Sequence, residues 1–246
     1  MRRYSWLLAF VAALALALPA GADTKINDTE SPGLAAGPNC DLTGYKYELQ
    51  AFSPPVTIPD NGAVNVLVGT LPTIADGSVI TDVILEVGMA HTWMGDFLVR
   101  LEYVDCASGA LLYGTNVLCR PRGTNAVGNA PCGTGTGVGC SGNLGTVATT
   151  TPPPAPVPYL FSDAAVAPIG DGICPTVAPS GCYKPSPGGA LVGFNGHLKG
   201  GCWRLLASDW AGGDLGTISY WAVWEQNQAP VPARLASWGK LKTLYR

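Results

Sequence analysis

The segment from His91 to Asp96 (HTWMGD) holds the residue types of a catalytic site, an imidazole and a carboxylate five positions apart. A serine protease needs a serine nucleophile, a histidine base and an acid that orients the histidine. The chain has one further histidine, His197, in a glycine-flanked loop, and it has no Gly-x-Ser-x-Gly motif. We therefore predict that the chain is not an enzyme. In this interpretation His91 and Trp93 pack a structural corner, where Asp96 accepts hydrogen bonds from backbone amides.

Four aspartates are candidate calcium ligands, because each lies at an expected strand end or in a turn. Calcium prefers several carboxylate and carbonyl oxygens, which the loops of a β-sandwich can supply. The sequence has no EF-hand spacing, so the ligands would have to converge from distant segments. The alternative is that these carboxylates cap turns. The candidates are Asp96, Asp163, Asp209 and Asp214, and no cofactor other than Ca²⁺ is predicted.

The seven tryptophans raise a second binding hypothesis, because aromatic faces stack on the apolar faces of sugars. Trp93 and Trp210 lie in expected turns and are the candidates for an exposed carbohydrate-binding surface. Trp203, Trp221 and Trp224 fall in strand patterns, where large aromatic residues fill the interior of a sandwich. The same explanation, burial in the core, is the alternative for Trp93 and Trp210.

The elements that position these residues are short strands. Apolar residues alternate from Val83 to Met89, from Phe97 to Tyr103, from Trp203 to Ala207 and, at Ile218, Tyr220, Ala222 and Trp224, along the last strand. An alternation of period 2 indicates strands, and turn residues such as Asp, Gly and Asn separate them. Between the two ends of the chain no stretch keeps a helical period. The pattern therefore predicts an all-β sandwich.

The two ends of the chain differ from this body. Residues 1–22 combine two arginines, an apolar run and a small-residue cleavage site, which predicts a secretory signal peptide and a secreted protein with no transmembrane segment after its removal. Residues 23–44 are expected to be a polar leader with little to pack. The tail, 229–246, is basic and has apolar residues at helical spacing, so it is predicted to be either a sorting signal or surface anchor, or a solvated extension.

Charge and cysteine content restrict the function further. Residues 23–228 contain 8 Lys and Arg against 17 Asp and Glu, a net charge of 8 − 17 = −9, which argues against a nucleic-acid partner. All eight cysteines lie after the signal peptide, and an even number in an exported protein favours disulfides. Cys132 with Cys140 and Cys174 with Cys182 would close short loops. The first of these pairs lies in 114–158, a Gly- and Pro-rich stretch without periodicity that is expected to be a long loop insertion.

Seven short motifs, in this order, resemble a known family. They are Ile58 to Gly62 (IPDNG), Ile80 to Val83 (ITDV), His91 to Asp96 (HTWMGD), Phe161 to Asp163 (FSD), Gly193 to Gly196 (GFNG), Gly201 to Leu205 (GCWRL) and the segment from Asp209 to Trp224. Together they are similar to the P domain (P/Homo B domain) of furin- and kexin-type proprotein convertases and of secreted bacterial subtilisin-like proteases. The resemblance covers residues 45–228. It implies a galactose-binding-like jelly-roll sandwich of about eight strands.

The resemblance also implies a function. A P domain packs on a subtilisin-like protease domain, stabilises it and influences its dependence on calcium and pH. Because nothing in this sequence resembles the subtilisin catalytic segments, we expect a secreted accessory or binding module whose partner is a protease or a cell surface in trans. The second hypothesis is a carbohydrate- or cell-surface-binding module, and the third is an enzyme in its own right.

Overall fold

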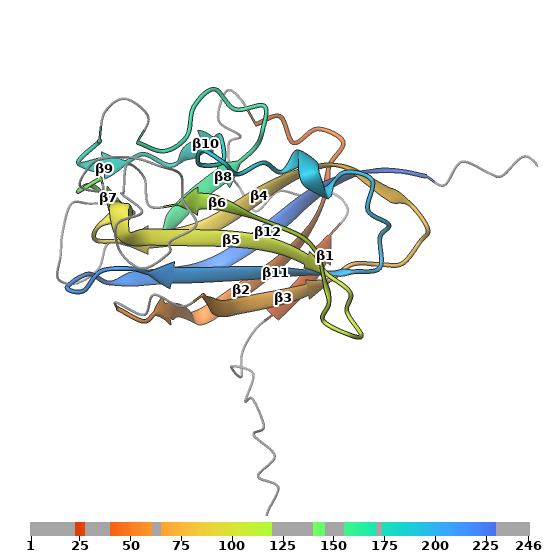
Figure 1. The fold of residues 1–246 in the computed structure, drawn as a ribbon, viewed down its shortest axis with the longest axis horizontal. Coiled ribbons are helices and arrows are strands. Elements are labelled where there is room, and N and C mark those ends of the chain that lie inside the picture. The colour runs from red at the N-terminus through yellow and green to blue at the C-terminus, as the bar shows by residue number, and fades with distance from the viewer. Residues whose placement is uncertain are drawn as a thin grey trace, which may run out of the picture.

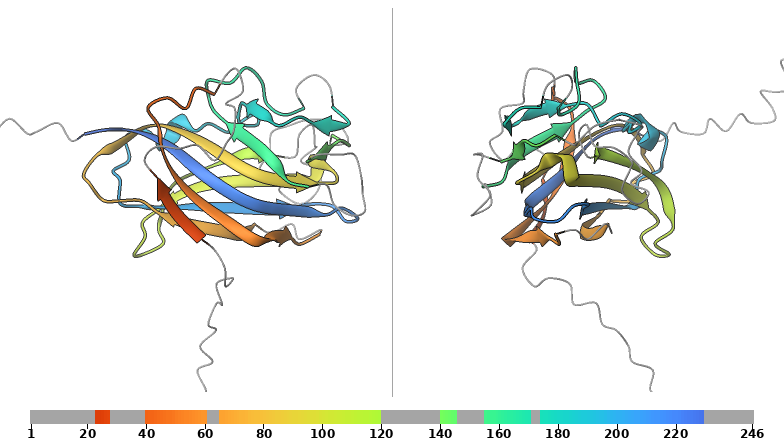
Figure 2. Two further views of the ribbon diagram at one scale, coloured as in Figure 1. Left: turned by 180° about the vertical axis from the view of Figure 1, so that it is seen from behind. Right: turned by 60° about the vertical axis from the view of Figure 1, so that its left-hand side comes forward.

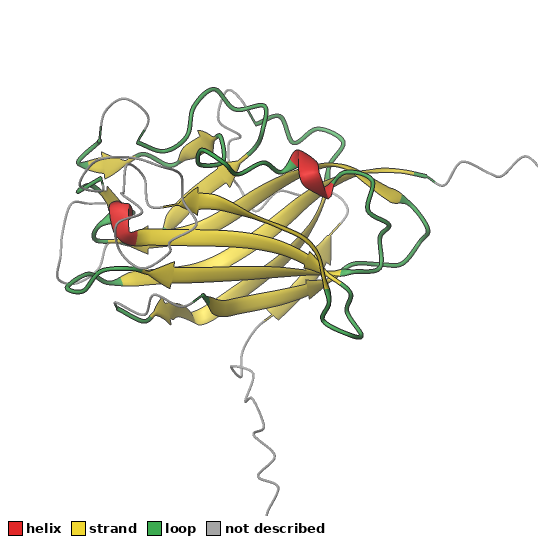
Figure 3. Ribbon diagram, viewed as in Figure 1, coloured by secondary structure: helices red, strands yellow, loops and turns green. Residues whose placement is uncertain are grey.

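The computed structural model describes residues 40–60, 65–119, 140–145, 155–170 and 174–229, together with the backbone of Asp23–Asn27. The signal peptide expected at 1–22 and, from residue 230 onward, the expected tail lie outside these residues. None of the helices within the described ranges has the length and apolar character needed to cross a bilayer. The two that are present are single 3-10 turns, η1 (Met94–Asp96) and η2 (Val192–Phe194), and Figure 3 shows them between long strands.

The strands form two sheets that stack face to face (Figures 1 and 2). The second sheet, in front in Figure 1, has four strands in the order β3-β11-β5-β6. Their bounds are β3 Val66–Pro72, β11 Cys202–Asp209, β5 Phe97–Val104 and β6 Leu111–Cys119. The first sheet, in front in the left view of Figure 2, is built on β2, β12, β4 and β8. Their bounds are β2 Lys46–Ile58, β12 Gly216–Gln228, β4 Val79–His91 and β8 Val157–Phe161.

These eight strands have the connectivity of a jelly roll. The order β2-β12-β4-β8 faces the order β3-β11-β5-β6, and all six pairings within the two sets are antiparallel. Successive strands of the chain thus alternate between the sheets, except for the β5-β6 hairpin, which lies within the second sheet, as two interlocked Greek keys require. The predicted all-β sandwich with about eight core strands is confirmed. Four shorter strands extend the first sheet: β1 Asp23–Asn27, β7 Asn143–Leu144, β9 Val177–Ala178 and β10 Gly181–Tyr183.

The core lies between the sheets and follows the predicted alternation in three strands. The inward residues of β4, β5 and β11 are fully buried and belong to one apolar cluster; they are Val83, Leu85, Val87 and Met89, Phe97, Val99, Leu101 and Tyr103, and Trp203, Leu205 and Ala207. Burial of each large apolar side chain stabilises the fold by roughly 1.5–3 kcal/mol relative to exposure. The core therefore fixes the register of the strands.

The strand predicted over Ile218 to Trp224 is confirmed as part of β12, but its apolar residues do not share one face. Its pairing shifts between Ile218 and Tyr220 against both neighbours, which marks a β-bulge. An extra residue exchanges the two faces of a strand, so Trp221 and Val223 continue the inner face that begins at Ile218. Trp224 instead packs outside the sheet, in a second cluster with Ala222, Tyr47, Ile84, Leu160 and Cys40.

Both expected disulfide pairs are wrong. Cys140 bonds to Cys174 and Cys182 bonds to Cys40, while a third bridge joins Cys106 to Cys202. Cys132 lies outside the described residues. The first bridge follows from strand pairing, because β7 and β9 are parallel with Asn143 opposite Val177, and each cysteine stands three residues before its strand. The predicted pairs joined cysteines that are close in sequence, and such spacing does not predict a bridge between distant segments.

Two segments contribute more to the sandwich than the sequence suggested. The expected leader, 23–44, supplies β1, which pairs with β2, and it supplies Cys40, which is 1% exposed. The strand β6 runs to Cys119, well into the expected insertion 114–158, because it pairs with β5 along its whole length. Residues 120–139 and 146–154 of that insertion lie outside the described residues.

Candidate functional site

The first candidate site is the corner that contains His91, at the end of β4. The imidazole Nε2 lies 3.1 Å from Asp209 Oδ2, and the backbone N–H of Trp93 donates to Nδ1 at 3.0 Å. The ring of Phe97 stacks on the imidazole with 4.7 Å between centroids. Both His91 and Asp209 are 0% exposed. The partner of the histidine is therefore Asp209, which lies 118 residues away along the chain, and not the nearby Asp96.

This geometry defines the hydrogen-bonding role of the imidazole. Because Nδ1 accepts a hydrogen bond, it carries a lone pair, so Nε2 is the nitrogen that holds the proton and donates to Asp209. A histidine and an aspartate in this relation resemble two members of a catalytic triad. Here the pair is closed from solvent, with both nitrogens engaged. The arrangement is that of a buried structural contact, as the corner hypothesis predicts.

The turn after Asp209 is tied to the same corner. The hydroxyl of Thr92 donates to Asp214 Oδ1 at 2.8 Å and accepts from the backbone N–H of Leu215 at 2.9 Å. The N–H of Gly213 lies 3.1 Å from each carboxylate oxygen of Asp60, which joins the turn to the end of β2. Asp60 therefore caps the turn, and Asp214, a calcium candidate, accepts the hydroxyl of Thr92.

The four candidate calcium ligands do not form one site. Asp163 accepts the backbone N–H groups of Leu191 and Val192, and it follows Phe161, which pairs with Leu85 of β4. That position is six residues before the end of β4 at His91, about 20 Å along a strand. Among the described residues, no group of three or more His, Cys, Asp or Glu side chains is placed to hold a metal ion. Calcium binding by Asp96, Asp209 and Asp214 stays a prediction.

The two candidate tryptophans differ. Trp210 is 9% exposed, donates its indole N–H to Ser208 at 2.9 Å and packs with Leu98 and Cys119. Its expected exposure is therefore wrong, because the face of β5 opposite the core is also covered at this point. Trp93 is partly exposed and is the aromatic side chain of the corner that a partner can reach.

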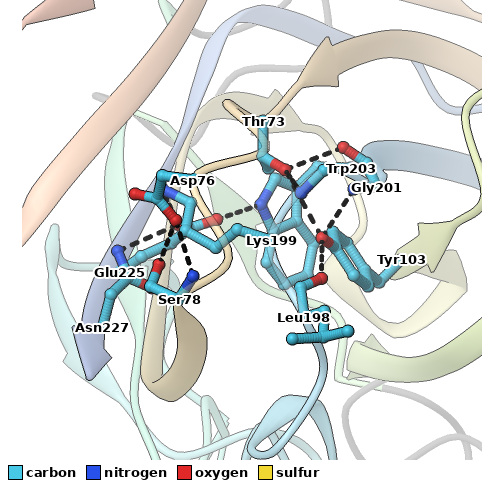
Figure 4. Close-up of polar contacts among 11 residues, drawn as sticks. Thr73, Asp76, Ser78, Tyr103, Leu198, Lys199, Gly201, Trp203, Glu225 and Asn227 are labelled. Atoms are coloured by element: carbon cyan, nitrogen blue, oxygen red, sulfur yellow. Dashed lines mark hydrogen bonds and ion pairs between the residues drawn. The ribbon is translucent and has the colours of Figure 1, made fainter. Parts of the chain in front are cut away.

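The second candidate site lies at the other end of the sandwich, and none of its residues was predicted as a site residue. A cavity of ≈ 260 Å³ opens there, lined by Glu48, Ile74, Asp76, Lys199, Glu225 and Asn227 among others. Glu48 and Glu225 come from the paired strands β2 and β12, and Lys199 comes from the loop before β11. Figure 4 shows Lys199 and Asp76 close to Glu225, beside Trp203 of the core.

Glu225 is the centre of the polar contacts at this end. Lys199 Nζ lies 2.9 Å from Glu225 Oε2, and the indole N–H of Trp203 donates to Oε1. The amide of Asn227 donates to Oε2 at 3.5 Å (Figure 4). The side chains of Glu225 and Lys199 are 3% and 8% exposed. A buried carboxylate of this kind is stable only when it is paired and hydrogen-bonded, and Glu225 meets both conditions.

Glu48 does not. It lies on the inward face of β2, two residues from the position opposite Glu225, and its side chain is 6% exposed. Its Oε2 atom is buried without a hydrogen-bond partner among the described residues. Burial, and after it repulsion by Glu225, raises the pKa of Glu48 to about 8, although the charge of Lys199 acts in the opposite direction. Strongly perturbed pKa values cluster at binding and catalytic sites, so Glu48 is a candidate site residue.

This pKa predicts an unusual pH dependence of stability. In the unfolded chain Glu48 loses its proton near the ordinary glutamate pKa of 4.5, whereas in the folded protein it keeps the proton up to about pH 8. Between these values the folded state binds more protons than the unfolded state, so the free energy of unfolding falls as pH rises, by at most about 1.4 kcal/mol per pH unit. Urea unfolding of the wild type and of Glu48→Gln from pH 5 to pH 9 measures it. The variant should lose this slope, and parallel profiles would contradict the assignment.

The orientation of β2 explains why this site was not predicted from the sequence. Glu48 alternates with Tyr47 and Leu49, and the period-2 pattern alone indicates that the apolar residues point inward. In the structure the outer face of the first sheet is covered by a second apolar cluster that includes Tyr47, so polar residues of β2 point inward instead. The available signal was a pair of isolated glutamates, Glu48 and Glu225, within otherwise apolar strands.

Comparisons with known proteins give no family for this chain: no family model, no curated protein and no solved structure matches it.

Proposed function

We propose that the chain is an exported, non-catalytic binding module of the P-domain type, which acts on a subtilisin-like protease in trans. The proposal rests on the seven ordered motifs and on what their residues do in the fold. Three disulfides among the described residues fit an oxidising compartment, in agreement with the signal peptide expected at 1–22.

The observation that carries the proposal is the meeting of three motifs at one corner. The motif that begins at Ile58 contributes Asp60, which caps Gly213. The motif of His91 to Asp96 contributes the imidazole bonded to Asp209 and the hydroxyl of Thr92. Motifs that are far apart in the sequence thus form one hydrogen-bonded unit, which is expected when their order reflects a shared architecture and not chance.

Three further motifs are joined by the same kind of contact. Asp163 accepts the N–H groups that precede Gly193, and the N–H of Gly196 donates to the carbonyl of Ile80. The motif residues therefore hold loops onto the sandwich, as a scaffold for binding requires. Their structural role also supports the absence of catalysis in the proposal, because His91 is engaged at both nitrogens.

A capture experiment tests the partner. The purified protein is immobilised, exposed to the exported proteins of its source, and the retained fraction is labelled with a fluorophosphonate probe for active serine hydrolases. We expect a labelled subtilisin-like protease, identified by mass spectrometry, and slower thermal inactivation of that protease when the protein is added. Trp93→Ala, which alters the partly exposed aromatic of the corner, is the matched bait and should retain less.

Two results would overturn the proposal. The first is the retention of no labelled hydrolase by a correctly folded bait. The second is the retention of cell-surface polysaccharide in place of protein, which would favour the carbohydrate-binding alternative.

A further inference from the structure

The cavity between the sheets at the Glu48 end combines a polar interior with an apolar rim. Ile74, which lines it, is 57% exposed. The interior contains Glu48 and Glu225 from the paired strands and Lys199 from the loop before β11. A volume of ≈ 260 Å³ is far above the roughly 10–15 Å³ that a single water requires. The space therefore suits a small molecule or a side chain, and it is larger than a bare ion needs.

The described polar atoms of this cavity that lack a hydrogen-bond partner are oxygens, and all of them are acceptors once Glu48 has lost its proton. Glu48 Oε2 and Asn227 Oδ1 are both buried without a hydrogen-bond partner among the described residues. Leaving such an atom unsatisfied costs about 1–3 kcal/mol. Glu48 is more than nine-tenths buried, so bulk water does not compensate it. A ligand that fits must bring hydrogen-bond donors.

The charges give the sign of the ligand. Lys199, the buried cation among the described residues of the cavity, is already held by Glu225 at 2.9 Å. Asp76, at the same cavity, accepts the N–H and the hydroxyl of Ser78. Lys46 also lines the cavity and lies opposite Glu225 on β2, but it is exposed. Among the described residues, ionised Glu48 therefore has no buried cation to itself, and an ammonium group supplies one together with three donors and no acceptor.

We propose that this cavity binds a primary alkylammonium group, with the ammonium on Glu48 Oε2 and Asn227 Oδ1 and the methylene chain against Ile74. The same chemistry is present in a free diamine and in a lysine side chain of a peptide. The inference is independent of the protease partner, because it uses the opposite end of the sandwich from the His91 corner.

Proton release follows from the state of Glu48. Its pKa of about 8 means that the empty site holds a proton near neutral pH, and an incoming ammonium replaces that proton. Binding should therefore strengthen as pH rises from 6 to 8. At pH 7 the observed heat should depend on the ionisation enthalpy of the buffer, because each bound ammonium releases up to one proton.

Isothermal titration calorimetry of the purified protein tests the proposal with two probes, 1,5-diaminopentane and Nα-acetyl-lysine amide. The neutral controls are 1-pentanol and the Nε-acetylated form of the second probe. We expect saturable binding of at least one amine, at least tenfold stronger at pH 8 than at pH 6, and at least tenfold weaker in Glu48→Gln. The matched variant is Glu102→Gln on the outer side of β5, which should bind like the wild type.

The outcomes separate the two sources and the alternative. Binding of the diamine alone supports a free amine as the ligand, and binding of the lysine derivative supports a peptide. Thermal unfolding at pH 6 verifies that Glu48→Gln is folded. The proposal is overturned if neither amine binds saturably at pH 8, if folded Glu48→Gln binds as well as the wild type, or if a neutral control binds as tightly as its amine.

Discussion

Replacing Asp209 with alanine should lower the free energy of unfolding by about 3–5 kcal/mol. The change removes the acceptor of the His91 Nε2–H and the acceptor of the Ala211 N–H, which lies 3.2 Å from Asp209 Oδ1. The imidazole is fully buried, so water cannot replace the lost carboxylate. Urea unfolding, followed by tryptophan fluorescence, measures the difference.

Asparagine at the same position is the matched control. Its carbonyl oxygen can still accept from His91, so Asp209→Asn should lose only about 1–2 kcal/mol. A double-mutant cycle with His91→Phe, which keeps an aromatic ring beside Phe97, should give a coupling of about 1–3 kcal/mol. Equal stabilities for the alanine and asparagine variants would contradict a structural role for the pair. No coupling in the cycle would contradict a direct interaction.

The sandwich was predictable because its signal is local. Alternation from Val83 to Met89 and from Phe97 to Tyr103 placed two strands with the correct face inward, since a period of 2 directly reports which side chains share a face. The β-bulge after Ile218 was not predictable in this way. One additional residue exchanges the faces of the rest of β12, and the sequence there contains apolar residues in both phases.

The contacts between distant segments could not be predicted from local sequence patterns. Asp96 was the carboxylate expected at the corner because it is near His91 in sequence, yet the imidazole bonds to Asp209, which the antiparallel pairing of β11 with β5 brings there. The disulfide predictions were wrong for the same reason, since Cys182 bonds to Cys40, which is 142 residues away in the sequence. Spacing along the chain carries information about turns and strands, and very little about which turns meet.

The two ends of the sandwich differ in how completely their buried polar groups are hydrogen-bonded. At the His91 corner, Thr92 and Asp214 form a closed set with their neighbours. At the opposite end, Glu225 is satisfied while Glu48 is not. A buried acceptor without a partner is destabilising. The Glu48 end therefore carries an unfavourable free-energy contribution that the His91 corner does not. That difference is the reason to look for a ligand at the Glu48 end and for structural stability at the corner.

Replacing Lys199 with methionine should lower the free energy of unfolding by about 3–5 kcal/mol, because it leaves the buried Glu225 carboxylate without its cation. Glu225 keeps the indole N–H of Trp203, but it is then left near Glu48 with no buried cation among the described residues of the cavity. The double variant Lys199→Met/Glu225→Gln removes both charges and should recover most of the loss, since a buried ion pair and its neutral replacement are often similar in stability.

Lys184→Met is the control, because that lysine is exposed and its replacement should change stability by less than about 0.5 kcal/mol. Urea unfolding at pH 7 compares the three variants with the wild type. The charges also predict a second effect. Lys199 lowers the pKa of Glu48, so its removal should raise that pKa further and move the alkaline end of the Glu48 stability slope to higher pH. A Lys199→Met protein as stable as Lys184→Met, with an unchanged pH profile, would contradict both the pairing with Glu225 and its influence on Glu48.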